Sequence, residues 1–276
     1  MSVNVRIKQK PLFKKKINIE EIVKLSNLSY GVCDENYRLI RNEIGNHTLI
    51  YDKKKLARGI DLSLDGNDIL LILSLPTCKE EIRLFYDVIE KYCNYFKTKT
   101  FIREEEQVHI KDKEKFIQYD EDGSIGGLED LQDNIRNDKY KRLEIFGIYN
   151  PISIGTQEVD EIDCNLNRFG LFLDRLQSLD VYYAAPKVYK VENQLVGIYA
   201  VGANIPSVVP IEPYIVLNQI QGIEKWYIMV KEGKTVPYED FIKHTQKQEY
   251  YDVNHVIVTL SDDEIDKLIK KYAQKI

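Results

Sequence analysis

The most distinctive arrangement of chemically active side chains lies in residues 118–129, QYDEDGSIGGLE. Aligned with a calcium-binding loop, Asp120 and Asp122 stand at ligand positions, and Glu129 stands where a bidentate carboxylate closes the site. Calcium prefers such oxygen ligands, and a central glycine permits the sharp turn that lets them converge. Gln118 occupies the first ligand position, so one expected negative charge is missing. We therefore prefer a second interpretation, an acidic Asp-Gly turn between short elements, and keep weak calcium binding as an alternative.

Histidine and cysteine spacing does not favour a zinc site. The four histidines include no pair at helical ligand spacing and none beside a cysteine; they are His47, His109, His244 and His255. The four cysteines form no C-x-x-C pair and fit reduced, partly buried side chains; they are Cys33, Cys78, Cys93 and Cys164. We expect His255, which opens an apolar segment, to be a hydrogen-bonded structural residue. We expect no cofactor, with weak calcium binding as the alternative.

Cys33 is the thiol that least resembles a core residue, because it lies in the irregular polar sequence SYGVCDENY. A thiolate enzyme would need a base beside this thiol in the folded chain, which sequence does not show. An incidental cysteine is the preferred interpretation.

Motifs of the common enzyme classes are absent from the sequence. There is no G-x-S-x-G, no H-E-x-x-H and no S-x-x-K in a supporting context. Gly123, Gly126 and Gly127 stand among acidic residues with no Lys-Ser/Thr after them, so neither a P-loop nor a dinucleotide fingerprint is present. The leading hypothesis is a non-catalytic binding or interaction module. The alternative is an enzyme whose site is built from scattered carboxylates and tyrosines.

Charge favours a protein partner over nucleic acid. The net charge is −5, whereas nucleic-acid affinity comes mainly from neutralising phosphates. The basic cluster of residues 6–16 could bind an acidic partner or nucleic acid, but a solvated edge strand and loop is preferred. The proline-rich stretch NIPSVVPIEPYI, with tyrosines nearby, could be a partner surface, but an edge strand is again preferred. Oligomeric state is left open.

The expected cellular compartment follows from two kinds of segment that the sequence does not show, a signal peptide and a membrane span. The amino terminus, MSVNVRIKQK, has no apolar signal-peptide segment, and the densest apolar run, residues 69–73, is far below the roughly 20 residues of a membrane span. We expect a soluble, cytoplasmic protein with no membrane partner.

The elements that would position any site are clearest in residues 60–96. Residues 60–64 alternate apolar and polar side chains, Asp-Gly-Asn-Asp supplies a turn, and residues 69–75 are nearly continuous apolar sequence. Such a run is typical of a strand covered on both faces. Thr77 with Glu80 then forms a capping box before an amphipathic helix.

The rest of the chain predicts further strands and helices. We predict loops and a short helix near residues 128–135 within the polar segment 112–141, a strand at residues 211–217, and a final helix capped by Ser261 and Glu264. The fold class is α+β, mainly antiparallel sheet with packed helices. We expect the chain to form two lobes, residues 1–150 and 151–276, or one continuous domain.

Two segments carry a family resemblance. Residues 58–86, RGIDLSLDGNDILLILSLPTCKEEIRLFY, and the tail from Trp226, with YEDFIKH and EYYDVNHVIVTLSDDEIDKL, resemble an uncharacterised domain-of-unknown-function family of Gram-positive bacteria. The resemblance implies a bacterial cytosolic protein. It supplies no activity and no site residues.

Overall fold

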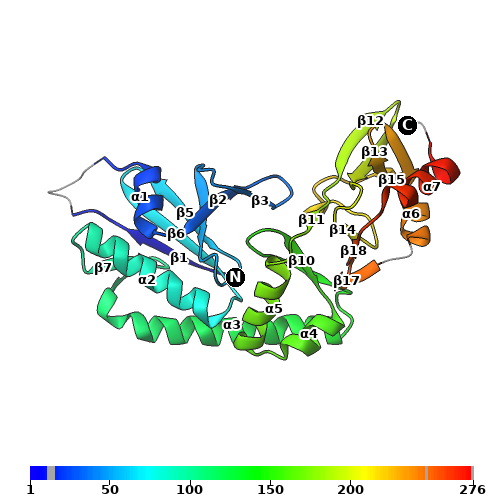
Figure 1. The fold of residues 1–276 in the computed structure, drawn as a ribbon. Helices are drawn as coiled ribbons and strands as arrows, with labels where there is room; N and C mark the ends of the chain where they lie inside the picture. Colours follow the sequence, from blue (N-terminus) through cyan, green and yellow to red (C-terminus); the bar gives the residue numbers. More distant parts are fainter. Residues whose placement is uncertain (11–15, 246–247, 275–276) are drawn as a thin grey trace. The chain divides into compact units, whose positions relative to one another are not determined.

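The computed structural model describes residues 1–10, 16–245 and 248–274. These form two compact units, Met1–Ser178 and Leu179–Ile276, each with helices and mostly antiparallel sheets (Figure 1). The α+β prediction is confirmed. The predicted lobe boundary at residue 150 falls inside the first unit.

Within its described residues, the first unit is built on one eight-stranded sheet in which each neighbouring pair is antiparallel. In spatial order the strands are β3 (Leu39–Arg41), β2 (Ser29–Cys33), β4 (His47–Tyr51), β5 (Ile60–Asp65), β6 (Asp68–Ser74), β1 (Ser2–Ile7), β7 (Thr100–Arg103) and β8 (Glu106–His109).

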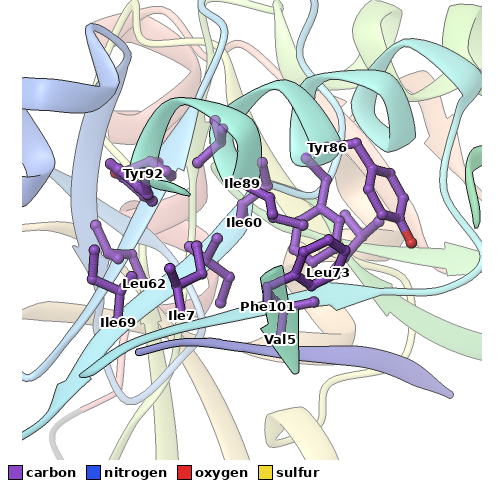
Figure 2. Close-up of a cluster of buried hydrophobic side chains, with 14 of the residues drawn as sticks. Val5, Ile7, Ile60, Leu62, Ile69, Leu73, Tyr86, Ile89, Tyr92 and Phe101 are labelled. Atoms are coloured by element: carbon purple, nitrogen blue, oxygen red, sulfur yellow. The ribbon is translucent and has the colours of Figure 1, made fainter. Parts of the chain in front are cut away.

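One face of this sheet carries the core. Helices α1 (Ile19–Ser26) and α2 (Lys79–Tyr95) contribute to the same buried cluster as the inward side chains of β1, β5 and β6. Figure 2 shows Tyr86, Ile89 and Tyr92 of α2 directed toward that face. The predicted hairpin and helix of residues 60–96 are confirmed. Because α2 is apolar along one stripe, its packing removes that stripe from water.

The other face of the sheet is only partly covered. On β6, Ile69, Leu71 and Leu73 are fully buried, whereas Leu70 and Ile72 are half-buried. The prediction that this apolar strand is covered on both faces is therefore wrong. Its continuous apolar sequence leaves large side chains on a face that in antiparallel sheets is commonly polar.

Helix α3 (Lys113–Arg136) replaces the predicted loops and short helix of the polar segment. Its buried stripe includes Asp120, Glu121 and Ser124 among apolar residues, so polar side chains obscure the helical period in the sequence. A Cβ at Gly127 would lie 3.3 Å from the ring of Pro76, so this glycine allows the helix to approach the end of β6 closely.

The start of α2 differs from the predicted capping box. The N-cap is Cys78, and the Thr77 hydroxyl donates to the carboxylate of Glu81 in place of the predicted pairing with Glu80. Oε1 of Glu81 also accepts hydrogen bonds from the backbone N–H of Gly59 at 2.6 Å and of Arg58 at 3.0 Å. The buried acid therefore ties the start of α2 to the segment that leads into β5.

The first unit ends with a two-stranded sheet and two helices: β9 (Leu143–Phe146), β10 (Pro151–Ile154), α4 (Thr156–Ile162) and α5 (Leu166–Gln177). A short 3₁₀ turn, Ile110–Asp112, precedes α3.

The second unit contains two four-stranded sheets in its described part. One orders as β11 (Tyr182–Tyr183), β14 (Ser207–Pro210), β18 (His255–Val258) and β17 (Gln248–Asp252). The other orders as β12 (Lys187–Val191), β13 (Gln194–Ala200), β15 (Ile223–Lys231) and β16 (Lys234–Pro237). Helices α6 (Tyr238–His244) and α7 (Asp262–Tyr272) contribute side chains to its core.

Two predictions for this unit are wrong and one is confirmed. The predicted strand at residues 211–217 is wrong: strand β14 ends at Pro210, and irregular chain with a 3₁₀ turn, Val216–Asn218, follows it. The proline-rich stretch is not an edge strand, because β14 pairs with β11 on one side and β18 on the other. The capping box is confirmed, since the backbone N–H of Ser261 donates to Glu264 at 2.8 Å.

Among residues 1–10, 16–245 and 248–274, no helix is both long enough and apolar enough to cross a bilayer.

Candidate functional site

The candidate site is the uncovered face of the eight-stranded sheet, where two pockets meet. The wide pocket encloses about 520 Å³ over β1, β6 and β7, and the narrow pocket encloses about 290 Å³ over β2, β4 and β5. Ile72 of β6 lines both pockets. We call the two pockets together the sheet groove.

The wide pocket has an apolar floor and a charged rim. Leu70, Ile72 and Ile102 line it at alternate strand positions that face away from the core. Arg6 at the rim binds Asp65 at 2.8 Å and Asp68 at 3.0 Å, and these hydrogen bonds raise its pKa.

The β7–β8 turn forms another part of this rim. Glu104 and Glu105 both adopt positive φ, and Glu104 accepts a 2.6 Å hydrogen bond from the backbone N–H of Asn4. The turn is therefore held against β1, where its carboxylates bound the pocket.

The narrow pocket brings together a thiol, an imidazole and a carboxylate from three neighbouring strands. Cys33 ends β2, His47 begins β4 and Asp61 lies on β5, and all three line the pocket. Nδ1 of His47 lies 3.1 Å from Oδ1 of Asp61. A hydrogen bond of this length orients the imidazole and leaves Nε2 as its second polar atom.

Arg58 supplies the permanent positive charge in the narrow pocket. Its Nε donates to the carbonyl oxygen of Phe146 at 3.1 Å, and its Nη1 donates to that of Pro76 at 3.1 Å. Burial lowers the pKa of Arg58, while the nearby Glu81 carboxylate opposes this shift. Phe146 stacks on Tyr37 with 4.2 Å between ring centroids, and the two rings form one wall of the pocket.

The thiol of Cys33 is held in its neutral form. Burial raises its pKa to about 11, and the carboxylates of Asp34 and Asp61 add to the shift. At neutral pH the resting site therefore contains a thiol and not a thiolate.

The predicted calcium ligands lie on α3 and not in a loop. Asp120 is buried and accepts a 2.6 Å hydrogen bond from Tyr86, whereas Asp122 and Glu129 are exposed. At 100° per residue, Asp122 and Glu129 both point away from Asp120 and lie about 10 Å apart along the helix axis. The helix therefore does not bring the three carboxylates together, and the described ranges contain no cluster of three His, Cys, Asp or Glu able to hold a metal ion.

The other sequence candidates are distributed differently. Arg6 and Lys8 of the basic cluster line the wide pocket, Lys10 and Lys16 are exposed, and Lys14 and Lys15 lie outside the described residues. His255 is a buried structural residue, as predicted.

His255 is held from both sides of its ring. Its Nδ1 lies 2.7 Å from Asp252, and its Nε2 lies 3.0 Å from the hydroxyl of Tyr183.

Sequence reasoning missed the grouping of Cys33, His47 and Asp61. Each residue has an inward-facing neighbour one position away, and this period-two pattern would have placed all three on the outward face. The order of the strands could not be read from the pattern, so their proximity was not predictable.

Comparison with known proteins gives one match. The model of a family described as "Domain of unknown function (DUF4299)" matches residues 2–268. Neither the curated proteins nor the solved structures gave a match. Because the family model spans nearly the whole chain, this protein belongs to the DUF4299 family, a domain of unknown function.

Proposed function

We propose that this chain is a binding module that takes an elongated, amphiphilic small molecule in the sheet groove. The observation that carries the proposal is the position of Ile72, which lines both pockets and makes their floors continuous across β6.

The floor of the groove supports an apolar ligand portion. Leu49, Leu70, Ile72 and Ile102 lie on the sheet face opposite the core, where they are only half-buried. Covering apolar surface here stabilises a complex by about 25 cal/mol for each Å² removed from water. Each pocket is near or within the range of about 300–1,000 Å³ that small-molecule sites occupy.

The ends of the groove support polar ligand groups. The wide pocket is bounded by Lys8, Glu104 and Glu105, and the narrow pocket contains Arg58, His47 and Asp61. Because Arg6 is already paired with two aspartates and Arg58 already donates to two carbonyl oxygens, Lys8 is the cation best placed to meet an acidic ligand group. A ligand with an apolar middle and polar ends matches this distribution.

The experiment is a calorimetric titration with fatty acids, their esters and amphiphilic peptides, preceded by a thermal-shift screen. Ile72→Arg places a charge on the groove floor and is expected to weaken binding by about tenfold or more. Ile40→Arg is the matched control, because Ile40 is an exposed isoleucine of the same sheet on the opposite face.

Ligand binding by these two variants tests the proposal. Lost binding in Ile72→Arg with unchanged binding in Ile40→Arg supports the proposal. Failure of every ligand, or equal binding by both variants, overturns it.

A further inference from the structure

We infer that Cys33 is an acyl-accepting thiol, that His47 is its general base, and that Asp61 positions the imidazole. The acyl donor is an ester or thioester of a carboxylic acid with an apolar chain. The chain preference rests on the function proposed for the sheet groove, whereas the thiol chemistry does not.

The register of the sheet brings the thiol and the imidazole to the same face. Gly31 of β2 lies opposite Leu49 of β4 in the last pair of these two strands, and Cys33 and His47 lie two residues beyond that pair. Because side chains alternate along a strand, Cys33 and His47 are on the same face as Gly31 and Leu49. Both side chains line the narrow pocket, so the pair is accessible to a small molecule.

The carboxylate of Asp61 favours one tautomer of the His47 imidazole. Leu49 of β4 pairs with Asp61 of β5, so Asp61 lies diagonally across from His47 on the same face. The 3.1 Å contact to Nδ1 favours the tautomer in which Nδ1 carries the proton and Nε2 accepts one.

A base is necessary at this site because the thiol is neutral when the pocket is empty. With the pKa of Cys33 raised to about 11, only a small fraction is thiolate near neutral pH. His47 therefore has to remove the proton during attack, as in other thiol–imidazole pairs.

The step conserves atoms and charge. Sγ of Cys33 attacks the carbonyl carbon, and the thiol proton passes to Nε2 of His47. The bond from the carbonyl carbon to the leaving oxygen or sulfur breaks, and that atom takes the proton from His47. The products are an acyl-Cys33 thioester and a free alcohol or thiol, with no oxidant or reductant needed.

Arg58 and Ile72 complete the arrangement. The guanidinium of Arg58 lines the same pocket and stabilises negative charge that develops on the carbonyl oxygen. Ile72 lines both the narrow pocket and the wide pocket. An apolar acyl chain attached at Cys33 would extend over Ile72 into the sheet groove.

The test measures acylation of the full chain by p-nitrophenyl acetate and p-nitrophenyl octanoate. Release of p-nitrophenolate gives the rate, and peptide mass mapping identifies the acylated cysteine. Cys164, a partly exposed thiol that contacts Gln132, serves as the comparison thiol in the same molecule. Cys33→Ser, His47→Gln and Asp61→Asn are compared with the unsubstituted chain, with melting temperature as the folding control.

The expected result is acylation of Cys33 ahead of Cys164, lost in Cys33→Ser and slowed about a hundredfold in His47→Gln. Asp61→Asn should give a smaller loss and a changed pH profile. Equal acylation of Cys33 and Cys164, or an unaltered rate in His47→Gln, would overturn the inference.

Chain length separates this inference from the groove proposal. Octanoate should react faster than acetate at low concentration. Ile72→Arg should remove that advantage, whereas Ile40→Arg, outside both pockets, should keep it. If acetate acylates Cys33 through His47 but octanoate has no advantage, the thiol inference stands and the apolar groove proposal fails.

Discussion

The hydroxyl of Tyr86 on α2 donates a 2.6 Å hydrogen bond to Oδ2 of Asp120 on α3, and both side chains are buried. Arg103 of β7 binds the other oxygen of Asp120, and its Nε lies 3.2 Å from the same Tyr86 hydroxyl. Side chains of α2, β7 and α3 therefore share one buried polar cluster. This gives Asp120 a structural role in holding α3 against α2 and the sheet.

Removing the Asp120 carboxylate should destabilise the first unit strongly. Asp120→Ala leaves the nearly buried guanidinium of Arg103 without its charge partner, for which the cost is about 3–5 kcal/mol. Urea unfolding measures the loss. Asp122→Ala, two residues away and exposed, is the control and should change stability by less than about 0.5 kcal/mol. Equal losses in the two variants would contradict the assigned role.

Calcium should not stabilise this protein specifically. A calcium site needs six to eight oxygen ligands converging on one point, whereas α3 directs Asp120 away from Asp122 and Glu129. The measurement is melting temperature with millimolar calcium and, separately, magnesium. A rise seen only with calcium, and abolished by Asp122→Ala with Glu129→Ala, would instead establish the weak calcium site considered from the sequence.

Helix α3 marks the limit of sequence reasoning about this fold. The segments with clean periodicity, such as β5, β6 and α2, were predictable because each has one apolar face. Helix α3 was not, because its buried acids make sense only once Tyr86 and Arg103 are known to face them. The glycines of α3 are typical of turns in the sequence for the same reason, because Pro76, against which Gly127 packs, is distant in sequence.

The candidate site shows a similar division. The alternation of apolar and polar residues predicts the strands correctly. The apolar run of β6, however, predicts that both faces of this strand are buried, and one face is only half-buried. Ile72 is instead part of a groove floor. Cys33 was recognised as the least core-like thiol, while the base it requires lies on another strand and became visible only through strand pairing.

The two adjacent glycines of α3 should respond differently to alanine. A Cβ at Gly126 meets no atom within 4 Å, whereas one at Gly127 meets three atoms of the Pro76 ring at 3.3–3.6 Å. Gly126→Ala should therefore stabilise the protein by about 0.5–1 kcal/mol through helix propensity. Gly127→Ala should lose that gain because a rigid ring must move. Urea midpoints measure both effects, and an equal gain in the two variants would show that the contact with Pro76 is not restrictive.

Stability should fall as the pH rises above about 9, because folding holds two buried thiols in their neutral form. Burial is the main cause that raises the pKa of Cys78 and Cys93 to about 12, against a normal value of 9.0. A raised pKa means that the folded chain keeps a proton that the unfolded chain releases. The stabilisation is therefore fully present below pH 9 and is lost as the pH rises toward the folded values.

For the fully buried Cys93 the loss at pH 10.5 should be about 2 kcal/mol. Urea unfolding at pH 7.5 and pH 10.5 measures the change. Lysines also lose charge in this range and weaken ion pairs, so Cys93→Ala is the necessary comparison. This variant should start less stable at pH 7.5 but lose less on going to pH 10.5. If the two proteins lose the same amount, the buried thiol does not govern the alkaline loss of stability.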